Sequence, residues 1–475
     1  MLDTLLTEVE KELGSLNHPE PLYIQLAQAL SNAIRSGQIG LGEKLPPHRE
    51  LAKRLKVNVS TVTRAMAILQ DDKLIETRPG RGTRVSAYRS EEAQFQSAPL
   101  NETGIIDLSV NRPATDAYNH VLAALLPELP LDPRFSSMKD YHPSEGPTWA
   151  REAAAAWLCQ QGLTANASQV IMCDGAQHGL ALALRAIVEP GETVLADDIT
   201  YQGIAALCRT LDVNLEGVRT DERGMVPQAL QDACNKHAPR AVFIVSSIQN
   251  PTAVTLDQER RNELLTVIEA AGVLLIEDDV YRPLLDTPIP PLASSLPEQT
   301  LYITSLSKCV APGLRIGFIL APADLVTDLS SSLRVDCWST APLSALVATR
   351  LMESGKVRDL IVVQREELRA RQAILRQIMG DLDVHSGPTA PHAWLKLPDS
   401  WQNHHFSNAC LNKGVAVLPG SAFVLAPQNT SNAIRINLSA ASTREQLTHG
   451  LTVIAELSRN GPPPQPRLSY DSNTQ

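Results

Sequence analysis

The sequence predicts an α/β fold in two parts: an N-terminal winged helix-turn-helix, and a larger domain with a mostly parallel sheet sandwiched by helices. The 475 residues exceed what one ordinary core organises, so at least two domains are expected. A compact basic segment between Lys44 and Arg89 stands out in a chain whose formal net charge is −10. From Ile105 to Ser458, apolar runs of strand length alternate with helical stretches, as in sheets that are covered on both faces.

Composition is typical of a cytoplasmic globular protein. Hydrophobic residues make up 43% of the chain, and no apolar run approaches the roughly 18 residues that span a bilayer, so we expect no membrane partner. The start, Met1-Leu2-Asp3-Thr4, lacks the basic and apolar regions of a signal peptide. The 7 cysteines are scattered without a Cys-x-x-Cys pair, which indicates reduced thiols rather than a disulfide framework or a metal site.

The chain is expected to divide into five segments. An amphipathic helical extension occupies residues 1–19, and the winged domain occupies 20–86. A linker without apolar periodicity follows at 87–104. The large domain spans 105–458, and a disordered tail with the run Gly461-Pro462-Pro463-Pro464 spans 459–475.

The basic segment has the pattern of a helix-turn-helix with a wing. Residues 21–36 repeat apolar side chains at helical spacing and end before Gly37. A second, short helix opens at Pro46-Pro47, and a third is expected over 60–70. Strands at 74–78 and 83–85 then flank a glycine-rich turn, which makes a β-hairpin wing.

Hydroxyl and basic side chains coincide on the surfaces that such a domain presents to a double helix. The third helix can place them against base edges, and the second helix and the wing can grip the backbone or the minor groove. The alternative is a winged protein-interaction module whose charges are solvated. We expect double-stranded DNA to be contacted by Arg49, Ser60, Thr61, Thr63, Arg64, Arg78 and Arg81.

Three runs in this region carry a family resemblance. They are Gly42-Glu43-Lys44-Leu45-Pro46-Pro47-His48-Arg49-Glu50-Leu51-Ala52, then Val59-Ser60-Thr61-Val62-Thr63-Arg64-Ala65, then Arg78-Pro79-Gly80-Arg81-Gly82-Thr83. Together they resemble the winged DNA-binding domain of the GntR family of bacterial regulators. One departure is Val59, where family members usually carry arginine or lysine.

The larger part reads as strands separated by helices. Apolar runs at 170–172, 193–196, 241–245, 273–276 and 301–304 have strand length, and helical stretches such as 177–188 and 258–271 separate them. Ligands of such folds gather at the carboxyl ends of the strands. Polar residues follow several of these runs, among them Gln177, Asn250 and Asp278.

The run from Ser305 to Gly317 carries the most chemistry. Ser305 and Ser307 precede Lys308, and Arg315 follows it. An amine that reacts with carbonyls therefore lies beside several ligands for phosphate. This suits pyridoxal 5'-phosphate, which is both an aldehyde and a phosphate ester. The alternative is a surface loop with a solvated lysine and arginine.

The order of Gly-Ala-Gln, Tyr201, Asn-Pro, Asp-x-x-Tyr, Ser-x-Ser-Lys and two arginines resembles fold-type-I aminotransferases, which are pyridoxal-phosphate-dependent transferases. Within that group it resembles the aminotransferase-type domain of MocR regulators, over most of residues 105–455. The resemblance implies two catalytic residues: Lys308, which would form an aldimine with the cofactor, and Asp278, which would pair with the pyridine nitrogen. It implies that the cofactor is held by Gly175, Ala176, Gln177, Tyr201, Asn250, Asp278, Tyr281, Ser305, Ser307, Lys308 and Arg315.

The resemblance also implies a binding site for a small amine or amino acid. Arg435 would clamp the carboxylate of that molecule, and Asn111 lies in the loop on the substrate side. Independently of the resemblance, reaction with an aldehyde requires an unprotonated lysine, so neighbouring cations and burial should depress the pKa of Lys308.

The predicted function is a homodimeric transcriptional regulator that binds promoter DNA and senses a small amine or amino acid through aldimine exchange at Lys308. Two alternatives stay open: a working aminotransferase with an accessory DNA-binding domain, and a regulator that senses pyridoxal phosphate itself. The fusion of a DNA-binding pattern to a catalytic-type domain favours regulation.

Overall fold

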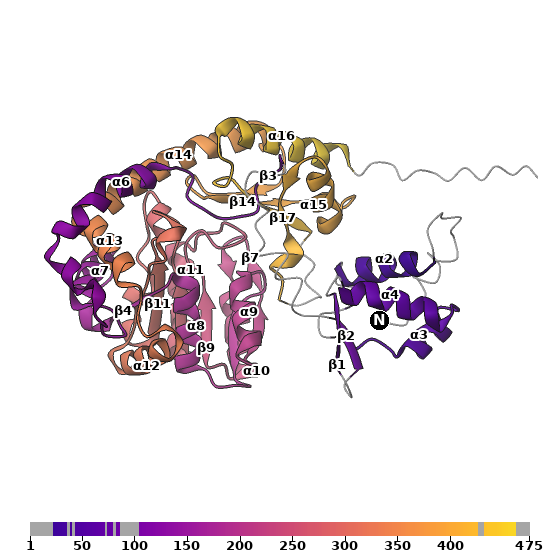
Figure 1. Ribbon diagram of the computed structural model, residues 1–475, viewed down its shortest axis with the longest axis horizontal. Coiled ribbons are helices and arrows are strands. Elements are labelled where there is room, and N and C mark those ends of the chain that lie inside the picture. Colours follow the sequence, from indigo (N-terminus) through magenta and orange to yellow (C-terminus); the bar gives the residue numbers. More distant parts are fainter. Residues whose placement is uncertain are drawn as a thin grey trace, which may run out of the picture. The chain divides into compact units, whose positions relative to one another are not determined.

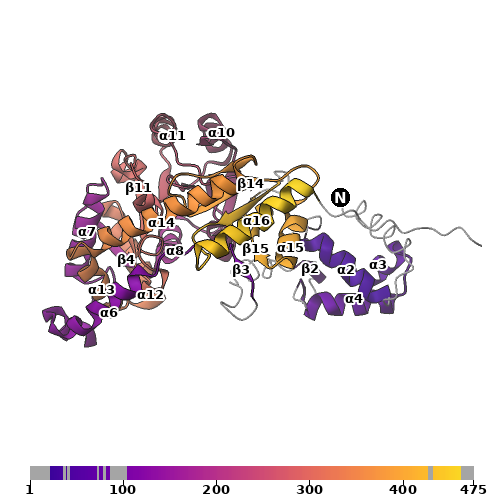
Figure 2. The same ribbon diagram turned by 90° about the horizontal axis from the view of Figure 1, so that it is seen from above.

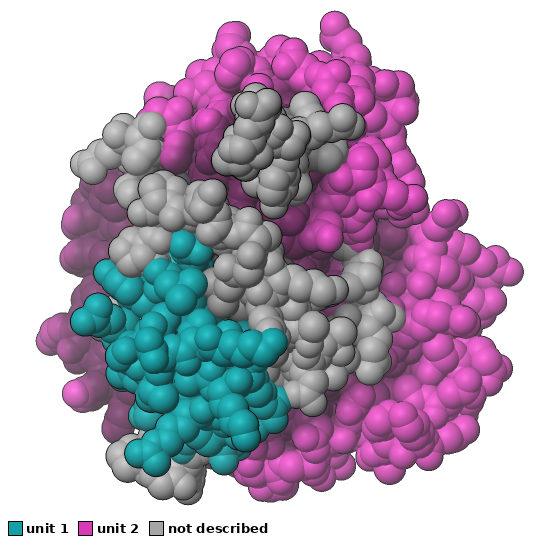
Figure 3. Space-filling model, turned by 90° about the vertical axis from the view of Figure 1, so that its right-hand side faces the viewer, with its two compact units in different colours: residues 1–98 teal, residues 99–475 magenta. Residues whose placement is uncertain are grey.

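The computed structural model describes residues 22–35, 39, 43–71, 74–78, 82–85, 104–425 and 432–461. The chain divides into two compact units, residues 1–98 and residues 99–475, which are coloured separately in Figure 3. The expected helical extension at 1–19, all of the expected linker at 87–104 except Gly104, and residues 462–475 of the expected tail lie outside the described residues.

The described residues of the first unit form three helices and a hairpin (Figure 1). They are α2 (Leu22–Arg35), α3 (His48–Arg54), α4 (Val59–Asp71), β1 (Ile75–Arg78) and β2 (Gly82–Val85). Pro47 precedes α3, and its carbonyl accepts the N–H groups of Glu50 and Leu51 at 2.8 and 3.0 Å, which starts the helix. Ile75 pairs with Val85 across the antiparallel hairpin. The predicted winged helix-turn-helix is confirmed.

Apolar residues at helical spacing make the core of this unit. Leu26 and Leu30 of α2 meet Leu51 of α3 and Val62 and Leu69 of α4, and all five side chains are at most 1% exposed. The periodicity read from the sequence therefore corresponds to the faces that pack.

The second unit is built on a seven-stranded sheet. In spatial order its strands are β4 (Val170–Cys173), β12 (Gly317–Leu320), β11 (Thr300–Ser305), β10 (Leu274–Asp278), β9 (Ala241–Ile244), β5 (Thr193–Asp197) and β6 (Asn214–Val218). Neighbours from β11 to β6 run parallel, whereas β12 is antiparallel to β11 and β4. The mostly parallel sheet is confirmed. Strand β12 was not predicted, because its apolar run is short and directly follows the loop of Lys308.

Helices cover both faces of this sheet, because successive side chains of each strand point to opposite sides. In β9, Phe243 packs in the cluster with α8 (Ala176–Ile187) and α12 (Val326–Cys337). Its neighbours Val242 and Ile244 pack with α10 (Pro227–His237) and α11 (Gln258–Ala271). Figure 2 shows these two pairs of helices apart from one another. The predicted sandwich is confirmed.

A second, four-stranded antiparallel sheet lies in the C-terminal part. Its order is β13 (Val384–His385), β14 (His392–Lys396), β17 (Ala433–Asn437) and β16 (Leu418–Pro419). The helices α14 (Lys356–Met379), α15 (Asn403–Asn412) and α16 (Arg444–Asn460) accompany it. Strand β3 (Ile106–Asp107) pairs in parallel with β15 (Val415–Ala416), which anchors the start of the unit beside its end.

The remaining elements connect these layers. They are α6 (Ala117–Leu125), α7 (Thr148–Gln160), α9 (Gln202–Thr210), α13 (Pro342–Glu353), β7 (Thr220–Asp221) and β8 (Gly224–Met225). None of the described helices combines the length and the apolar composition that crossing a membrane requires.

The expected start of the tail at residue 459 is wrong by two residues. Helix α16 continues to Asn460, and the guanidinium of Arg459 pairs with the carboxylate of Asp381 at 2.6 Å. A side chain at the end of the helix thus extends it past the last apolar residue, Leu457, which marked the boundary in the sequence.

Arg371 of α14 ties three segments of the second unit together. Its side chain is buried, and it donates hydrogen bonds to the carbonyls of Leu438 and Ala441, both at 2.8 Å, and of Ala114 at 3.2 Å. Its Nε–H also donates to Glu367 at 2.7 Å. One buried cation therefore supplies donors to three carbonyls of separate segments in the interior.

We predict that Arg371→Leu destabilises the protein by about 3–5 kcal/mol, because it leaves the carbonyls of Leu438, Ala441 and Ala114 without this donor in the interior. Urea unfolding followed by circular dichroism measures the change. Arg376→Leu on the exposed face of the same helix is the matched control and should stay within about 0.5 kcal/mol of the wild type. Equal effects of the two substitutions would contradict this role of Arg371.

Candidate functional site

Residues that follow or end five strands meet at one edge of the large sheet. Gly175 follows β4, Tyr201 follows β5, Asn250 follows β9, Asp278 ends β10 and Ser305 ends β11. Because these strands run in one direction, their carboxyl ends share an edge. Segments far apart in the sequence thereby contribute to one site.

Lys308 lies in the loop after β11 and is partly buried. Its Nζ donates a hydrogen bond to the backbone carbonyl of Asn111 at 3.0 Å. Burial is the main reason that its pKa falls to about 8, and the cations of Arg435 and Arg315 lower it further, against the opposing carboxylate of Asp278. About a tenth of this amine is therefore uncharged, and hence nucleophilic, at pH 7, which is far more than for an ordinary lysine.

Asp278 is a buried carboxylate with little compensation from the protein. Its Oδ1 accepts one long hydrogen bond, from the N–H of Val280 at 3.4 Å. Burial raises its pKa to about 7, although the N–H of Val280 and the amine of Lys308 lower it. A cationic N–H donor beside this carboxylate would supply the missing charge and hydrogen bond.

Arg435 projects from β17 into the same site and is 4% exposed. Its Nη1 donates to Oδ1 of Asn250 at 2.8 Å, and its Nη2 donates to the carbonyl of Ser109. The guanidinium carbon lies 5.0 Å from the ring centroid of Phe423. Burial lowers the pKa of Arg435 to about 10, so it stays a cation at neutral pH.

Arg315 and two glycines shape the opposite end of the site. Gly175 precedes α8 with φ +84°, a left-handed conformation that favours glycine. Arg315 Nη2 donates to the carbonyl of Asp174 at 2.5 Å. A Cβ on Gly317 would lie 2.7 Å from the carbonyl carbon of Gly175, so strand β12 and the start of α8 approach too closely for any side chain.

The free amides at the start of α8 face the same end. Ala176 begins the helix, and its N-terminal N–H groups and positive dipole end suit an anion. Gln177 Nε2 donates to the carbonyl of Gly203 at 3.3 Å. Ser305 Oγ accepts the N–H of Ser307 at 3.3 Å at the start of the Lys308 loop.

An amide network holds the tyrosine next to Lys308. Asn111 Nδ2 donates to the hydroxyl of Tyr281 at 2.7 Å, and Asn437 donates to Oδ1 of Asn111. His392 packs edge-on against the Tyr281 ring, with centroids 5.5 Å apart, and donates from Nε2 to the carbonyl of Gln249 at 3.0 Å. Burial lowers the pKa of His392 to about 3, so its ring is neutral.

The structure brings most of the predicted cofactor residues together. Tyr201 is close enough to Asp278, Arg435 and Arg315 for their charges to act on its hydroxyl, whose pKa rises to about 12 mainly through burial. The charges of the same three groups also shift the pKa of Lys308. Asn111 was expected to lie on the substrate side, but in the structure it contacts other protein groups. Its side-chain amide bonds Tyr281 and Asn437, and its backbone carbonyl accepts the hydrogen bond of Lys308.

Sequence reasoning missed three residues that position this site. Asn437 follows Arg435 by two residues in β17, so both point to one face, and that spacing was a usable signal. Gly203 has no room for a side chain, since a Cβ would lie 2.3 Å from the ring of Tyr201. The sequence favours a structural role for His392 over an acid–base role, but its positioning contacts could not be read, because its neighbours Gln249 and Tyr281 come from distant segments.

The described residues fit pyridoxal phosphate by the chemistry of their donors. Arg315 and Arg435 form no ion pair with any carboxylate in the described ranges, which leaves two guanidinium cations for a phosphate and a carboxylate, beside the amine of Lys308 for the aldehyde. Nε of Arg435 is buried and has no hydrogen-bond acceptor among the described residues. Asp278 lacks the cationic partner that a pyridine N–H provides.

The predicted DNA contacts lie on the surface of the first unit. Arg49, Ser60, Thr63 and Arg64 are exposed, and Thr61 is half-buried. The guanidinium of Arg64 lies 5.6 Å from the Tyr23 ring centroid, and Thr63 is bonded to His48 at 3.3 Å. The backbone of Arg78 pairs with Gly82 in the hairpin, but its side chain and all of Arg81 lie outside what the structure describes.

Comparison with known proteins agrees with both units. Residues 103–454 match the family described as aminotransferase class I and II, and residues 22–85 match the bacterial regulatory proteins of the gntR family. YdeF of Bacillus subtilis, an uncharacterized HTH-type transcriptional regulator, is 27% identical, and the match covers 92% of this chain and 94% of YdeF. The HTH-type transcriptional regulator TauR of Rhodobacter capsulatus is 26% identical over 90% of this chain and 93% of TauR.

A solved aminotransferase has the same fold as the second unit. LysN of Thermus thermophilus, an alpha-aminoadipate aminotransferase complexed with N-(5'-phosphopyridoxyl)-L-leucine, matches with a TM-score of 0.67 and 22% identity. The match covers 79% of this chain and 97% of LysN.

The fold and the comparisons define a DNA-binding transcriptional regulator joined to an aminotransferase-like domain. The chain belongs to the class I and II aminotransferase family and, through its gntR-type domain, to the regulators of the MocR type. Both resemblances seen in the sequence are thereby confirmed, and the family implies pyridoxal phosphate as the cofactor.

We predict that Gly317→Ala weakens the binding of pyridoxal phosphate at least about tenfold, because a methyl 2.7 Å from Gly175 displaces the start of α8. Equilibrium dialysis measures the affinity, and thermal unfolding without cofactor reports any loss of the fold. Gly313→Ala is the matched control, since no atom lies within 4 Å of its added Cβ. Unchanged affinity in Gly317→Ala would remove this close approach from the cofactor site.

We also predict how the attachment of the cofactor depends on pH. Only the unprotonated amine reacts, so the rate at which cofactor-free protein attaches pyridoxal phosphate should rise about tenfold per pH unit and level off above about 8. Arg435→Met removes a cation that depresses this pKa, so the levelling should move to higher pH. Stopped-flow absorbance between pH 6 and 10 measures both profiles. A wild-type rate that still rises steeply beyond about pH 9 would show an ordinary lysine.

Proposed function

We propose that this regulator binds promoter DNA and senses a small amine or amino acid by amine exchange at Lys308 on pyridoxal phosphate. One observation carries the proposal. A lysine with a depressed pKa lies close enough to two guanidiniums for their charges to act on it, and neither guanidinium forms an ion pair with a carboxylate in the described ranges, in a chain that also carries an exposed recognition helix. The amine suits an aldehyde, and the guanidiniums suit the two anionic ends of the bound molecules.

Different residues around Lys308 would each bind a different part of the cofactor. Asp278 would hold the ring nitrogen, and Tyr201 would stack on the ring. Asn250 and Tyr281 would bond the phenolic oxygen. When bound, the cofactor supplies an aldehyde carbon at which one amine can replace another. The phosphate would be held by Gly175, Ala176, Gln177, Ser305, Ser307 and Arg315.

The effector would lie between Lys308 and Arg435. Arg435 offers a free Nε–H beside its two bonded amino groups, which matches a carboxylate that needs two donors. Release of the Lys308 amine would change its hydrogen bond to the carbonyl of Asn111. Arg435 bonds Ser109 in the same segment, so the effector would act on residues 109–111 from two sides.

We propose that residues 109–111 transmit the change on effector binding from the Lys308 site toward the DNA-binding unit. Residues 109–111 follow β3 closely, and β3 is the first strand after the stretch that joins the two units in the sequence. A ligand shifts a conformational equilibrium only by its differential affinity for the two states. The altered bonds at Asn111 and Ser109 would supply that difference.

The DNA-binding unit would act in a homodimer in the cytoplasm, with two recognition helices on two half-sites. Exposed aromatic residues support a partner subunit. Tyr141 is 86% exposed and packs against Trp338 with ring centroids 5.1 Å apart, and Val335 on the adjoining helix is 89% exposed. Large apolar groups gathered in this way are typical of subunit contacts.

Two other functions use the same residues. A working aminotransferase is favoured by the convergence of Lys308, Asp278 and Arg435, which would serve turnover as well as sensing. A regulator that senses pyridoxal phosphate itself needs only the residues for the phosphate and the ring. The three candidates differ in what DNA affinity responds to.

We predict that one member of an amine and amino-acid panel changes the DNA affinity of the cofactor-loaded protein at least about fivefold. DNA selected from a random pool serves as the binding site, and fluorescence anisotropy measures the affinity. Lys308→Ala should abolish both the response and the borohydride-trapped adduct on this residue, with non-specific DNA binding retained. Lys356→Ala, an exposed lysine at the start of α14, is the matched control and should respond normally.

The remaining outcomes separate the candidates. Multiple turnover with an amino acid and a keto acid at about 1 s⁻¹ or faster would contradict regulation as the main function. A DNA response to pyridoxal phosphate alone, and to no amine, would select cofactor sensing. An adduct on Lys308→Ala would refute the assignment of the lysine.

A further inference from the structure

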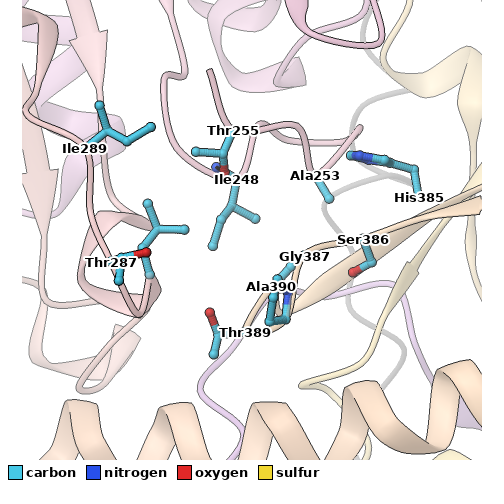
Figure 4. Close-up of a pocket in the computed structure, with 12 residues that line it drawn as sticks. Ile248, Ala253, Thr255, Thr287, Ile289, His385, Ser386, Gly387, Thr389 and Ala390 are labelled. Atoms are coloured by element: carbon cyan, nitrogen blue, oxygen red, sulfur yellow. Dashed lines mark hydrogen bonds between the residues drawn. The ribbon is translucent and has the colours of Figure 1, made fainter. Parts of the chain in front are cut away.

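A second pocket lies behind the Lys308 site, at the seam between the two sheets of the second unit (Figure 4). Its volume is about 280 Å³. Three segments form its walls: the loop after β9, the residues 285–289 that follow the turn after β10, and the hairpin between β13 and β14. We call this space the seam pocket.

The walls of the seam pocket suit an uncharged molecule. Ile248 and Ala253 are buried apolar residues of one wall, and Thr389 is a buried hydroxyl residue opposite them. Figure 4 shows the side chains of Ile248 and Thr389 on facing sides of the space. Among the described residues, no carboxylate, lysine or arginine lines it. His385, an ionisable residue in its described lining, has its Nδ1–H committed to the carbonyl of Thr252 at 2.7 Å.

The loop that forms one wall is held in an unfavourable conformation. Ile248 and Ala253 have φ +48° and +61°, in the left-handed region that β-branched residues in particular avoid. Short hydrogen bonds keep them there: Ile248 N–H donates to Thr255 Oγ1 at 3.0 Å, and Ala253 N–H donates to the carbonyl of Gln249 at 2.7 Å. Strained backbone conformations of this kind persist only where the surrounding structure fixes them, and they are common at ligand-binding sites.

The same loop and hairpin are also walls of the Lys308 site. Gln249, next to Ile248, accepts the Nε2–H of His392, whose ring packs on Tyr281. Asn250 accepts a hydrogen bond from Arg435. On the other side, Ser386 Oγ donates to the carbonyl of His392 at 2.8 Å. A molecule that moves the walls of the seam pocket apart or together therefore moves Gln249, Asn250 or Ser386. These residues are bonded to His392 or Arg435, or lie next to such bonds, in the Lys308 site.

We propose that the seam pocket binds a small uncharged molecule with an apolar body and a single hydroxyl or carbonyl group, and that its binding is coupled to amine binding at Lys308. The coupling rests on the proposed function, whereas the binding does not. A cavity of about 150 Å³ accommodates benzene, so the seam pocket is large enough for a substituted ring. Thr255 and Thr389 would bond its polar group, and the two ligands would change one another's affinity by the same factor.

The test uses 4-fluorobenzyl alcohol and the full-length, cofactor-loaded protein. Broadening of the ¹⁹F resonance reports binding, and the visible absorbance of the cofactor reports amine binding with and without the alcohol. We expect millimolar binding to the wild type and to Lys308→Ala, and a change in amine affinity of at least about fivefold in the wild type.

Two substitutions locate the effect. Thr287→Trp at the exposed rim should fill the seam pocket and abolish the broadening. Thr266→Trp on the exposed side of α11, outside the pocket, is the matched control and should bind normally. Thr389→Val keeps the shape of the side chain but removes its hydroxyl, so it should weaken the binding of 4-fluorobenzyl alcohol but not the binding of 4-fluorotoluene.

Each failure has a distinct meaning. Absence of broadening at millimolar alcohol, or equal broadening in Thr287→Trp, overturns the pocket as a binding site. Binding that leaves amine affinity unchanged overturns the coupling. If no amine alters the absorbance at all, the proposed sensing function fails, while the ¹⁹F result still decides the seam pocket.

Discussion

The second unit depends on keeping one amine reactive inside a cluster of positive charge. The fall in the pKa of Lys308 from 10.5 to about 8 corresponds to a free energy on the order of 3 kcal/mol against its charged form. Burial and the guanidinium of Arg435 are the main sources of that cost. They act only when β17 of the small sheet and the loop after β11 of the large sheet are both in place.

The hydrogen bonds around this amine connect it to the segment 109–111, which is why we propose a sensing role for the site. Lys308 bonds the backbone of Asn111, whose side chain is held by Tyr281 and Asn437, while Arg435 bonds Ser109. Residues 109–111 thus take part in the site through their backbone as much as through side chains. The loop after β9 lines the seam pocket through Ile248 and Ala253, and the same loop bonds His392 through Gln249 and Arg435 through Asn250. A change in this loop at either site therefore alters contacts of His392 and Arg435.

Much of this organisation could be read from the sequence because it follows local rules. Helical spacing of Leu26, Leu51 and Val62 predicts the packed faces of the winged unit, since a helix repeats its contacts every 3.6 residues. Continuous apolar runs predict the buried parallel strands, and the order of polar residues after them predicts the edge where Lys308 and Asp278 lie. The antiparallel β12 and the four-stranded sheet escaped prediction, because their strands are short and their pairing is between distant segments.

The sequence by itself determined the class of protein, the two units, the lysine and the set of residues around it, because reaction with an aldehyde and binding of a phosphate demand particular side chains in a recognisable order. Only the tertiary structure decided that Asn111 holds Lys308 through its backbone, that Asn437 and His392 position the neighbours of Lys308, and that a second pocket lies behind them. The reason is physical: backbone acceptors carry no sequence signature, and a cavity exists only where segments from distant parts of the chain pack against one another.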